Sequence, residues 1–268
     1  MNYWLIPTLV LALTLFGVGT LLAPRLESRL QFWLVAGAGV LASIPAIVFA
    51  IYYLRVFNEP LWLYQLRAWP CTELAAGGAG FLAGLLHGRY STKPQFRRVA
   101  GRWFFPGALL LGLLMPYAKP ILRPPRWGEF QDRWSEGVCL QTSESSCGPA
   151  CASTLLRQLG KPATEKEIAQ ASFTSRSGTE NWYLARTLRQ RGIQVRFCLR
   201  RDPSMPWPIP SIAGVRLSSF GNSGHFISIL GHADDKFIIG DPLEGKLVLS
   251  KSALLEKYTF TGFFMQLD

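Results

Sequence analysis

A cysteine stands where a polar run of the sequence gives way to an apolar one. The stretch "SESSCGPACASTLL" covers residues 143–156, and Cys147 lies at its turning point. If a helix starts there, its first turn carries unpaired N–H groups and a partial positive charge. Both stabilise a thiolate, which is the nucleophilic form of cysteine. Cys147 is therefore a candidate nucleophile, although a small buried cysteine fits this stretch as well.

A thiol nucleophile usually works with a base, and the chain has three histidines. His87 lies in an apolar segment and is expected to pack or to sit at an interface. His232 lies in the turn "GHADD" and is expected to be solvated. His225 opens the apolar run "HFISIL", where an imidazole needs a partner or a function. Of the three histidines, His225 is therefore the one for which a partner is expected.

A carboxylate partner for His225 follows from a predicted hairpin. Residues 225–230 and 236–241 are read as strands joined by the five-residue loop Gly231–Asp235. Leu230 then faces Lys236, and His225 faces Asp241. Opposed side chains have Cβ atoms roughly 4.5–5.5 Å apart. Asp241 could then hold the imidazole as the third member of a triad. A polar pair at a hairpin end is the alternative, and a shift of one residue would separate the pair.

Hydrolysis through a tetrahedral intermediate also needs donors for the oxyanion. The N–H of Cys147 is one candidate. The side-chain amide of Gln141, six residues upstream in a turn-rich run, is the second. The alternative for Gln141 is a solvated glutamine in a loop.

The elements that must position these residues change in type along the second half of the chain. Apolar spacing and capping residues predict helices over 147–159, 164–171 and 180–191, of which the second begins with a capping box of Thr164 and Glu167. Alternating patterns then predict strands over 193–199, 209–217, 225–230, 236–241 and 246–250. Helices followed by strands indicate an α+β domain with an antiparallel sheet.

The first half of the chain is unusually apolar. Four segments are candidates to cross ~30 Å of hydrocarbon, namely Tyr3–Ala23, Phe32–Leu54, Cys71–Tyr90 and Trp103–Leu122. In the third, Gly80, Gly84 and Gly88 share one helix face, which suits close packing in lipid; a buried soluble helix is the alternative. A signal peptide is the alternative for the first segment, but its start has no basic residue and its apolar run is too long.

These patterns divide the chain into a transmembrane helical region at 1–122, a linker at 123–134 and an α+β domain at 135–268. The net charge of +11 splits into +7 for residues 1–122 and +4 for residues 123–268, which suits contact with anionic lipid rather than nucleic acid. In a four-span arrangement the loop charges divide seven to six, so the side that holds the domain stays undetermined. The five cysteines suggest neither a disulfide framework nor a metal site.

Taken together, the second half resembles the peptidase C39 family, papain-like cysteine peptidases known for removing double-glycine leader peptides from bacteriocin precursors. The resemblance covers about residues 138–268 and rests on five segments: "QTSESSCGPAC" from Gln141, "SGTENWYLARTLRQRG" from Ser177, "PSI" from Pro210, "GHFISIL" from Gly224 and "GDPLEG" from Gly240. It implies a papain-like fold with Cys147 as nucleophile, His225 as base, Asp241 as orienting acid and Gln141 as oxyanion donor.

Two departures from the family stand out. Ser146 occupies the position where the family often has Asp. The best-known members also carry this domain at the N-terminus of an ABC exporter, whereas here it follows a small membrane region, and the sequence has no G-x-x-x-x-G-K-[ST] motif.

The resulting expectation is a multi-pass, membrane-anchored cysteine peptidase that needs no cofactor and processes a peptide or protein, such as a leader peptide. Its expected partners are the lipid bilayer and a separate exporter. Two alternatives keep the same fold. One is a papain-like acyl or peptidyl transferase. The other is a non-catalytic module that binds leader peptides.

Overall fold

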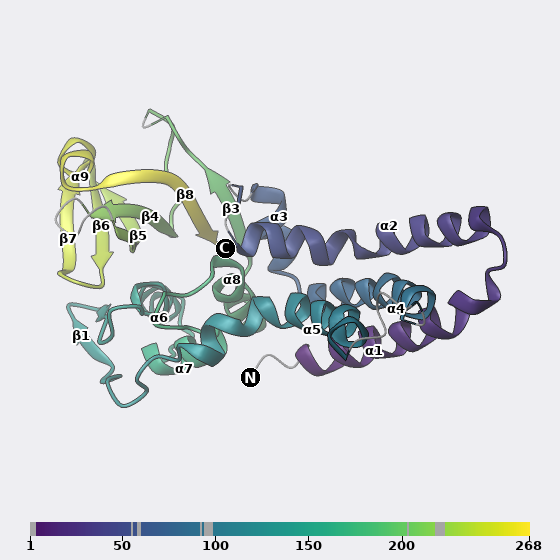
Figure 1. The fold of residues 1–268 in the computed structure, drawn as a ribbon. Helices are drawn as coiled ribbons and strands as arrows, with labels where there is room; N and C mark the ends of the chain where they lie inside the picture. Colours follow the sequence, from purple (N-terminus) through teal and green to yellow (C-terminus); the bar gives the residue numbers. More distant parts are fainter. Residues whose placement is uncertain are drawn as a thin grey trace. The chain divides into compact units, whose positions relative to one another are not determined.

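A computed structural model of the chain describes residues 4–54, 56–57, 60–91, 93, 99–202, 204–217 and 223–268 (Figure 1). Tyr3, where the first predicted span begins, lies outside these residues, as do three arginines of the charge count, Arg55, Arg97 and Arg98. The chain forms two compact units. One holds Pro60–Trp69 and Lys119–Asp268; the other holds the described residues of Asn2–Glu59 and Pro70–Ala118.

The second of these units is helical. Its elements are α1 (Leu5–Leu22), η1 (Ala23–Arg25), α2 (Arg29–Tyr53), η2 (Thr72–Gly78), α4 (Ala79–Tyr90) and α5 (Val99–Leu122), whose last residues belong to the other unit. A capping box starts α2, because the Ser28 side chain accepts from Gln31 N and the Gln31 side chain accepts from Ser28 N.

The expected number of about four membrane-spanning helices is not confirmed. Among the described residues, two helices are long and apolar enough to cross a membrane, Leu5–Arg25 and Arg29–Tyr53, with mean hydropathies of 2.2 and 2.3. The predicted third span divides into the 3₁₀ helix η2 and the 12-residue α4. In α5 the apolar part is the shorter Arg102–Met115. Length and composition thus support two candidate spans.

The glycine face predicted in the third segment packs closely against a neighbouring helix. A Cβ atom at Gly80, Gly84 or Gly88 would overlap a backbone carbonyl oxygen of α1. The hydroxyl of Thr20 on α1 also donates to the carbonyl of Gly84 at 3.2 Å. The expected close approach of helices through small residues is therefore confirmed for α1 and α4.

The other unit contains an α+β domain. Its helices are α3 (Leu61–Arg67), α6 (Cys147–Gln158), α7 (Glu165–Ala171), α8 (Asn181–Gln190) and α9 (Lys251–Lys257). Its strands are β1 (Arg133–Ser135), β2 (Val138–Leu140), β3 (Val195–Leu199), β4 (Ser211–Leu217), β5 (Ser223–Ala233), β6 (Lys236–Asp241), β7 (Gly245–Ser250) and β8 (Thr259–Leu267).

Six strands form one antiparallel sheet in the order β3-β8-β4-β5-β6-β7, while β1 and β2 form a separate pair. The predicted antiparallel sheet is thus present, and the three predicted helices α6, α7 and α8 agree to within about two residues at each end. The predicted capping box of Thr164 and Glu167 starts α7. Sequence reasoning missed α9 and β8, although β8 lies inside the sheet between β3 and β4.

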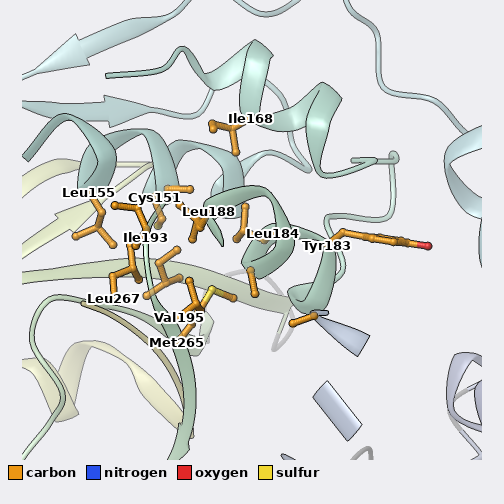
Figure 2. Packing of buried hydrophobic residues seen from close by; sticks show 14 of the residues in the cluster. Cys151, Leu155, Ile168, Tyr183, Leu184, Leu188, Ile193, Val195, Met265 and Leu267 are labelled. Atoms are coloured by element: carbon orange, nitrogen blue, oxygen red, sulfur yellow. The ribbon is translucent and has the colours of Figure 1, made fainter. Parts of the chain in front are cut away.

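Two apolar clusters cover the two faces of this sheet. The first joins α6, α7 and α8 to β3, β4 and β8; Figure 2 shows Leu155, Leu184, Leu188 and Met265 gathered in it. The second gathers side chains of β4, β5, β6, β8 and α9 with Trp207 and Tyr258. Residues of one strand alternate between the clusters, as in β8, where Phe264 belongs to the second and Met265 to the first.

The short helix α3 is part of the first cluster although it comes about 70 residues earlier than β1 in the chain. The centre of the Tyr64 ring lies 5.9 Å from the centre of the Trp182 ring and 5.7 Å from that of Phe263. The Arg67 guanidinium lies 3.4 Å from the centre of the Trp182 ring, and its backbone carbonyl accepts from Arg186 at 2.7 Å. Residues 60–69 therefore help to complete the core of the α+β unit, although the predicted boundaries at 122 and 135 assign them to the helical region. Those boundaries stay predictions.

Candidate active site

Cys147 is the first residue of α6 and is partly exposed. Ser146 occupies the N-cap position, but its side chain makes no hydrogen bond that caps the helix. Instead, the Ser146 hydroxyl donates to the Ser143 carbonyl at 2.8 Å and accepts from Ser143 N at 3.2 Å. This closes the turn before the helix, and Ala150 N donates to Ser146 O as the first helical bond. The thiol is thereby placed in the first turn of a helix, where the helix dipole favours a negative charge.

His225 lies near the start of β5 and is buried, with 6% of its surface exposed. Its Nε2 lies 3.0 Å from Oδ1 of Asp241, the last residue of β6. The contact predicted between these two side chains is therefore present. With Nε2–H turned to the carboxylate, Nδ1 is the ring nitrogen left for another partner.

The electrostatic surroundings of His225 favour its charged form. Burial lowers the pKa of His225, but hydrogen bonds with Asp241 and Cys147 raise it, as do the charges of both groups, to about 9. Cys147 thus acts on the same ring as Asp241. An imidazole held by a carboxylate and a thiol can take the thiol proton and remain as an imidazolium.

Asp241 is almost fully buried, and its carboxylate is held by several donors. Oδ1 accepts from Leu243 N at 2.8 Å as well as from His225, and Oδ2 accepts from the Tyr258 hydroxyl at 2.5 Å. Burial raises the pKa of Asp241, yet the hydrogen bonds from His225, Tyr258 and Leu243 outweigh it and leave the pKa below its usual value. Over the pH range in which the His225 imidazole is protonated near neutrality, the Asp241 carboxylate is therefore negatively charged.

The register by which this contact was predicted is wrong. The connecting loop has two residues, Asp234 and Asp235, both at positive φ, where five were predicted. As a result, the residue paired with Lys236 is Ala233, whereas the prediction paired Lys236 with Leu230. An irregularity between Ile229 and Gly231 then shifts the register by one, so that Ser228 pairs with Gly240. Continued by one residue, this register places Ile227 opposite Asp241. His225 lies two residues further along the same face, and the two side chains meet on a diagonal.

Gln141 follows β2, and its backbone N–H donates to the Pro242 carbonyl at 2.9 Å. This bond ties the start of the turn before Cys147 to the residue after Asp241. The Gln141 side chain donates from Nε2 to the Ser143 carbonyl at 3.1 Å, and its buried Oε1 has no hydrogen-bond partner among the described residues. Because Nε2 carries two N–H groups, one remains for a ligand.

The other two histidines lie elsewhere. His87 packs against the Phe16 ring in the helical unit, with 5.3 Å between ring centres, and His232 packs edge-on against Phe237 at 4.7 Å. Cys151, one turn after Cys147, is buried and donates to the Phe226 carbonyl at 3.3 Å. Burial raises the pKa of Cys151 well above its usual value. In the described residues, no group of three or more His, Cys, Asp or Glu is arranged to hold a metal ion.

Sequence reasoning missed two residues that support this site. Tyr258 reaches Asp241 from the junction of α9 and β8, and no sequence motif around it indicates a polar role. Glu165, fully buried at the first position of α7, accepts from both the N–H and the hydroxyl of Thr142, the residue after Gln141. A negatively charged side chain at a helix start is expected for the helix alone, so its long-range partner leaves no signal in the sequence.

Comparisons with known proteins show which family the α+β domain is similar to. The model of the peptidase C39 family matches residues 135–267. Uncharacterized proteins of Methanothermobacter marburgensis and Methanothermobacter thermautotrophicus are 29% and 26% identical to the chain over 130 residues, which is 46% of this chain and 84% of each relative.

Two solved structures are similar. One is a double glycine motif protease from an AMS/PCAT transporter in complex with the leader peptide, at 18% identity over 52% of this chain and 93% of that chain, with a TM-score of 0.42. The other is the peptidase domain of Streptococcus ComA, a bi-functional ABC transporter, at 20% identity over 48% and 94%, with a TM-score of 0.40. Together with the family model, the expected helices and antiparallel sheet identify the domain: residues 135–267 of this chain belong to the peptidase C39 family.

Proposed function

We propose that this protein is a cysteine peptidase that hydrolyses a peptide bond in a peptide or protein substrate. The observation that carries the proposal is the buried His225, which is hydrogen-bonded to Asp241 at 3.0 Å and on which Cys147 also acts. A thiol at a helix start, an imidazole and a charged carboxylate are the three groups that this chemistry requires.

In the proposed mechanism, the proton of the Cys147 thiol already lies on Nδ1 of His225, whose raised pKa favours the imidazolium, and the resulting thiolate attacks the carbonyl carbon of the substrate. Asp241 holds the ring through Nε2 and stabilises the imidazolium. The N–H of Cys147 and the free N–H of Gln141 Nε2 donate to the oxyanion. The imidazolium then gives its proton to the leaving amine. Water, deprotonated by His225, attacks the thioester, releases the acid and restores the thiol.

A leader peptide that ends in two glycines is the substrate class we propose, since members of this family are known for removing such leaders. The anchoring to a membrane is proposed on the two candidate spans of the helical unit. A separate exporter as partner, and the side of the membrane that holds the domain, stay predictions.

The test uses the full chain, purified in detergent, and a synthetic peptide with a Gly-Gly sequence between a fluorophore and a quencher. Wild-type protein should cleave the peptide after the second glycine, and Cys147→Ala should abolish cleavage. The control is Cys198→Ala, the same substitution at a buried cysteine of β3, which should cleave like wild type. Mass spectrometry in the presence of an added amine or thiol separates hydrolysis from acyl transfer. A Cys147→Ala protein that cleaves as fast as wild type would overturn the proposal.

If the peptide binds to the wild-type protein but neither hydrolysis nor transfer occurs, the non-catalytic alternative holds. Binding is measured with the same peptide by fluorescence anisotropy, without the quencher. The Cys147→Ala variant is informative here because it should retain binding when cleavage is lost. These measurements together assign the domain to one of the three functions.

A further inference from the structure

Tyr258 is a buried tyrosine whose hydroxyl is aimed at the proposed active site. It lies between α9 and β8, is 2% exposed and belongs to the second apolar cluster of the sheet. Its O–H donates to Oδ2 of Asp241 at 2.5 Å. A tyrosine in an apolar cluster normally brings its hydroxyl to a partner, and here that partner is the carboxylate that holds His225.

The two oxygens of Asp241 have different donors. Oδ1 accepts from His225 and from Leu243 N. Within the described part of the chain, the donor to Oδ2 is the Tyr258 hydroxyl. The rotation of a carboxylate about its last side-chain bond is soft, so its own covalent geometry does not fix the direction of Oδ1. Donors on both oxygens do fix it, and burial makes each of them costly to lose.

We propose that Tyr258 is a positioning residue, which holds the Asp241 carboxylate so that Oδ1 faces Nε2 of His225. This inference rests on the proposed function for its kinetic consequence, but the arrangement itself concerns only Tyr258, Asp241 and His225. Without the hydroxyl, Oδ2 is left buried in an apolar cluster with no donor. The carboxylate then turns toward another donor or takes up a proton, and either change weakens its hold on the imidazole.

Other ionisable groups also act on this pair. Besides Asp241, Glu244 and Cys151 bear on Tyr258, and burial raises the pKa of its hydroxyl most strongly. Glu244 is paired with Lys257 at 2.7 Å, which offsets its charge. Cys147 and Asp241 are the groups that act on His225. A hydroxyl that stays protonated is a permanent donor, as a positioning role requires.

The experiment is a double-mutant cycle on the full chain, with Tyr258→Phe, Asp241→Asn and the double variant. The first measurement is the titration of His225, followed by NMR on protein with labelled histidine. The chain has three histidines, and the His225 signal is assigned by its loss in His225→Ala. The second measurement is kcat and KM for the Gly-Gly peptide. Tyr183→Phe is the matched control, because Tyr183 is equally buried but lies on α8.

In wild type, His225 should titrate near 9. Tyr258→Phe should lower its pKa by about one unit and kcat by about tenfold, the size of one hydrogen bond to a charged group, with KM unchanged. In the Asp241→Asn background, Tyr258→Phe should change neither quantity further. Tyr183→Phe should match wild type. An unchanged His225 pKa in Tyr258→Phe, or an equal shift in the Asp241→Asn background, overturns the proposal.

The two proposals fail in different ways. If His225 responds to Tyr258→Phe but no peptide is cleaved, the positioning role stands and the peptidase proposal falls. If the peptide is cleaved but Tyr258→Phe changes neither kcat nor the pKa of His225, the peptidase proposal stands and the positioning role of Tyr258 falls. Should Tyr258→Phe not fold, the double variant decides, since it leaves no buried charge without its donor. Its folding would confirm that the tyrosine acts through the carboxylate, and its failure to fold would assign Tyr258 a purely structural role.

Discussion

Glu165 holds Thr142 by two hydrogen bonds, from the Thr142 N–H to Oε1 at 2.9 Å and from its hydroxyl to Oε2 at 2.6 Å. Thr142 follows Gln141 directly, so a fully buried carboxylate on α7 fixes the turn that leads from the proposed oxyanion donor to the proposed nucleophile. The turn has little secondary structure of its own, which makes this external anchor important for its shape.

Glu165→Gln should therefore impair catalysis indirectly, by loosening the turn at Thr142 rather than by changing a group that contacts the substrate. The amide can accept only one of the two bonds, and its NH₂ group faces a donor. We expect kcat to fall by about tenfold with KM nearly unchanged, less than the 10²–10³-fold typical of deleting an oxyanion donor. The control is Glu167→Gln on the same helix, where glutamine preserves the capping box. Equal kinetics of the two variants would show that the anchor does not affect the site.

Asp241→Asn should preserve the fold, because an amide fits the same space, and reduce turnover by up to ~10⁴-fold by analogy with a serine triad. The loss arises because the amide removes the charge that stabilises the imidazolium and can favour the wrong tautomer. His225→Ala should cost at least as much. Turnover of the Gly-Gly peptide measures both, and a fully active His225→Ala protein would sink the mechanism.

Alkylation should distinguish the thiols of the α+β domain. Cys147 is partly exposed, whereas Cys139, Cys151 and Cys198 are buried. Burial also raises the pKa of Cys139 and of Cys151, which keeps them as unreactive thiols. Iodoacetamide should modify Cys147 first, as read by peptide mass spectrometry of the folded protein. Labelling of all four at one rate would argue against an activated Cys147.

Stability should fall as pH rises past neutrality. The pKa of His225 is raised in the folded state to about 9 from an ordinary 6.5. Its protonation therefore stabilises the fold fully below about 6.5, and this contribution is lost as pH rises through about 9. The loss should amount to about 3 kcal/mol, visible as a falling Tm between pH 6 and 10. Asp241, whose pKa is lowered, contributes above its unfolded pKa and loses that contribution in acid.

The control for this pH dependence is His225→Ala, which should flatten the alkaline fall in Tm. A fall of the same size in that variant would assign the effect to other groups.

The α3 helix should contribute to the stability of the α+β domain. Tyr64→Ala removes a ring that packs on Trp182, Phe197 and Phe263, and we expect a loss of about 2 kcal/mol. Trp62→Ala is the matched control, because Trp62 lies on the same helix with 61% of its surface exposed. The protection of α8 and β3 amides from hydrogen exchange measures the effect. Equal protection in both variants would exclude a role for Tyr64.

Local patterns predicted much of the α+β domain, because its helix caps and strand alternation are written in short stretches. The positions of Cys147, His225 and Asp241 could be inferred in this way. The register of β5 and β6 could not, because a tight turn at Asp234 and an irregularity near Leu230 are tertiary choices between similar hairpins. The shorter loop and the irregularity each shift the pairing of β5 with β6, and together they shift it by an even number of residues. An even shift keeps each side chain on its predicted face of the sheet, so the predicted contact between His225 and Asp241 still forms.

The supporting residues were hidden for a different reason. Tyr258 and Glu165 act through partners that are 17 and 23 residues away in the chain, and neither has a local pattern that indicates a polar contact. The strand β8 was missed because Gly262, at φ +78°, interrupts its alternation and its pairing with β4 shifts between Ala213 and Val215.

The membership of α3 in the α+β unit also constrains how the chain threads through a bilayer. Residues 60–69 and 119–268 form one packed body, and a bilayer cannot run through such a body. In the membrane-anchored protein proposed above, the chain would therefore leave this body at Trp69 and return to it at Lys119 on the same side of the membrane. Under that proposal, the residues between Trp69 and Lys119 would cross the membrane an even number of times or not at all, so α4 and α5 would either both cross or both stay on one side. A reporter fused at residue 268 consequently reports the compartment of α3 as well.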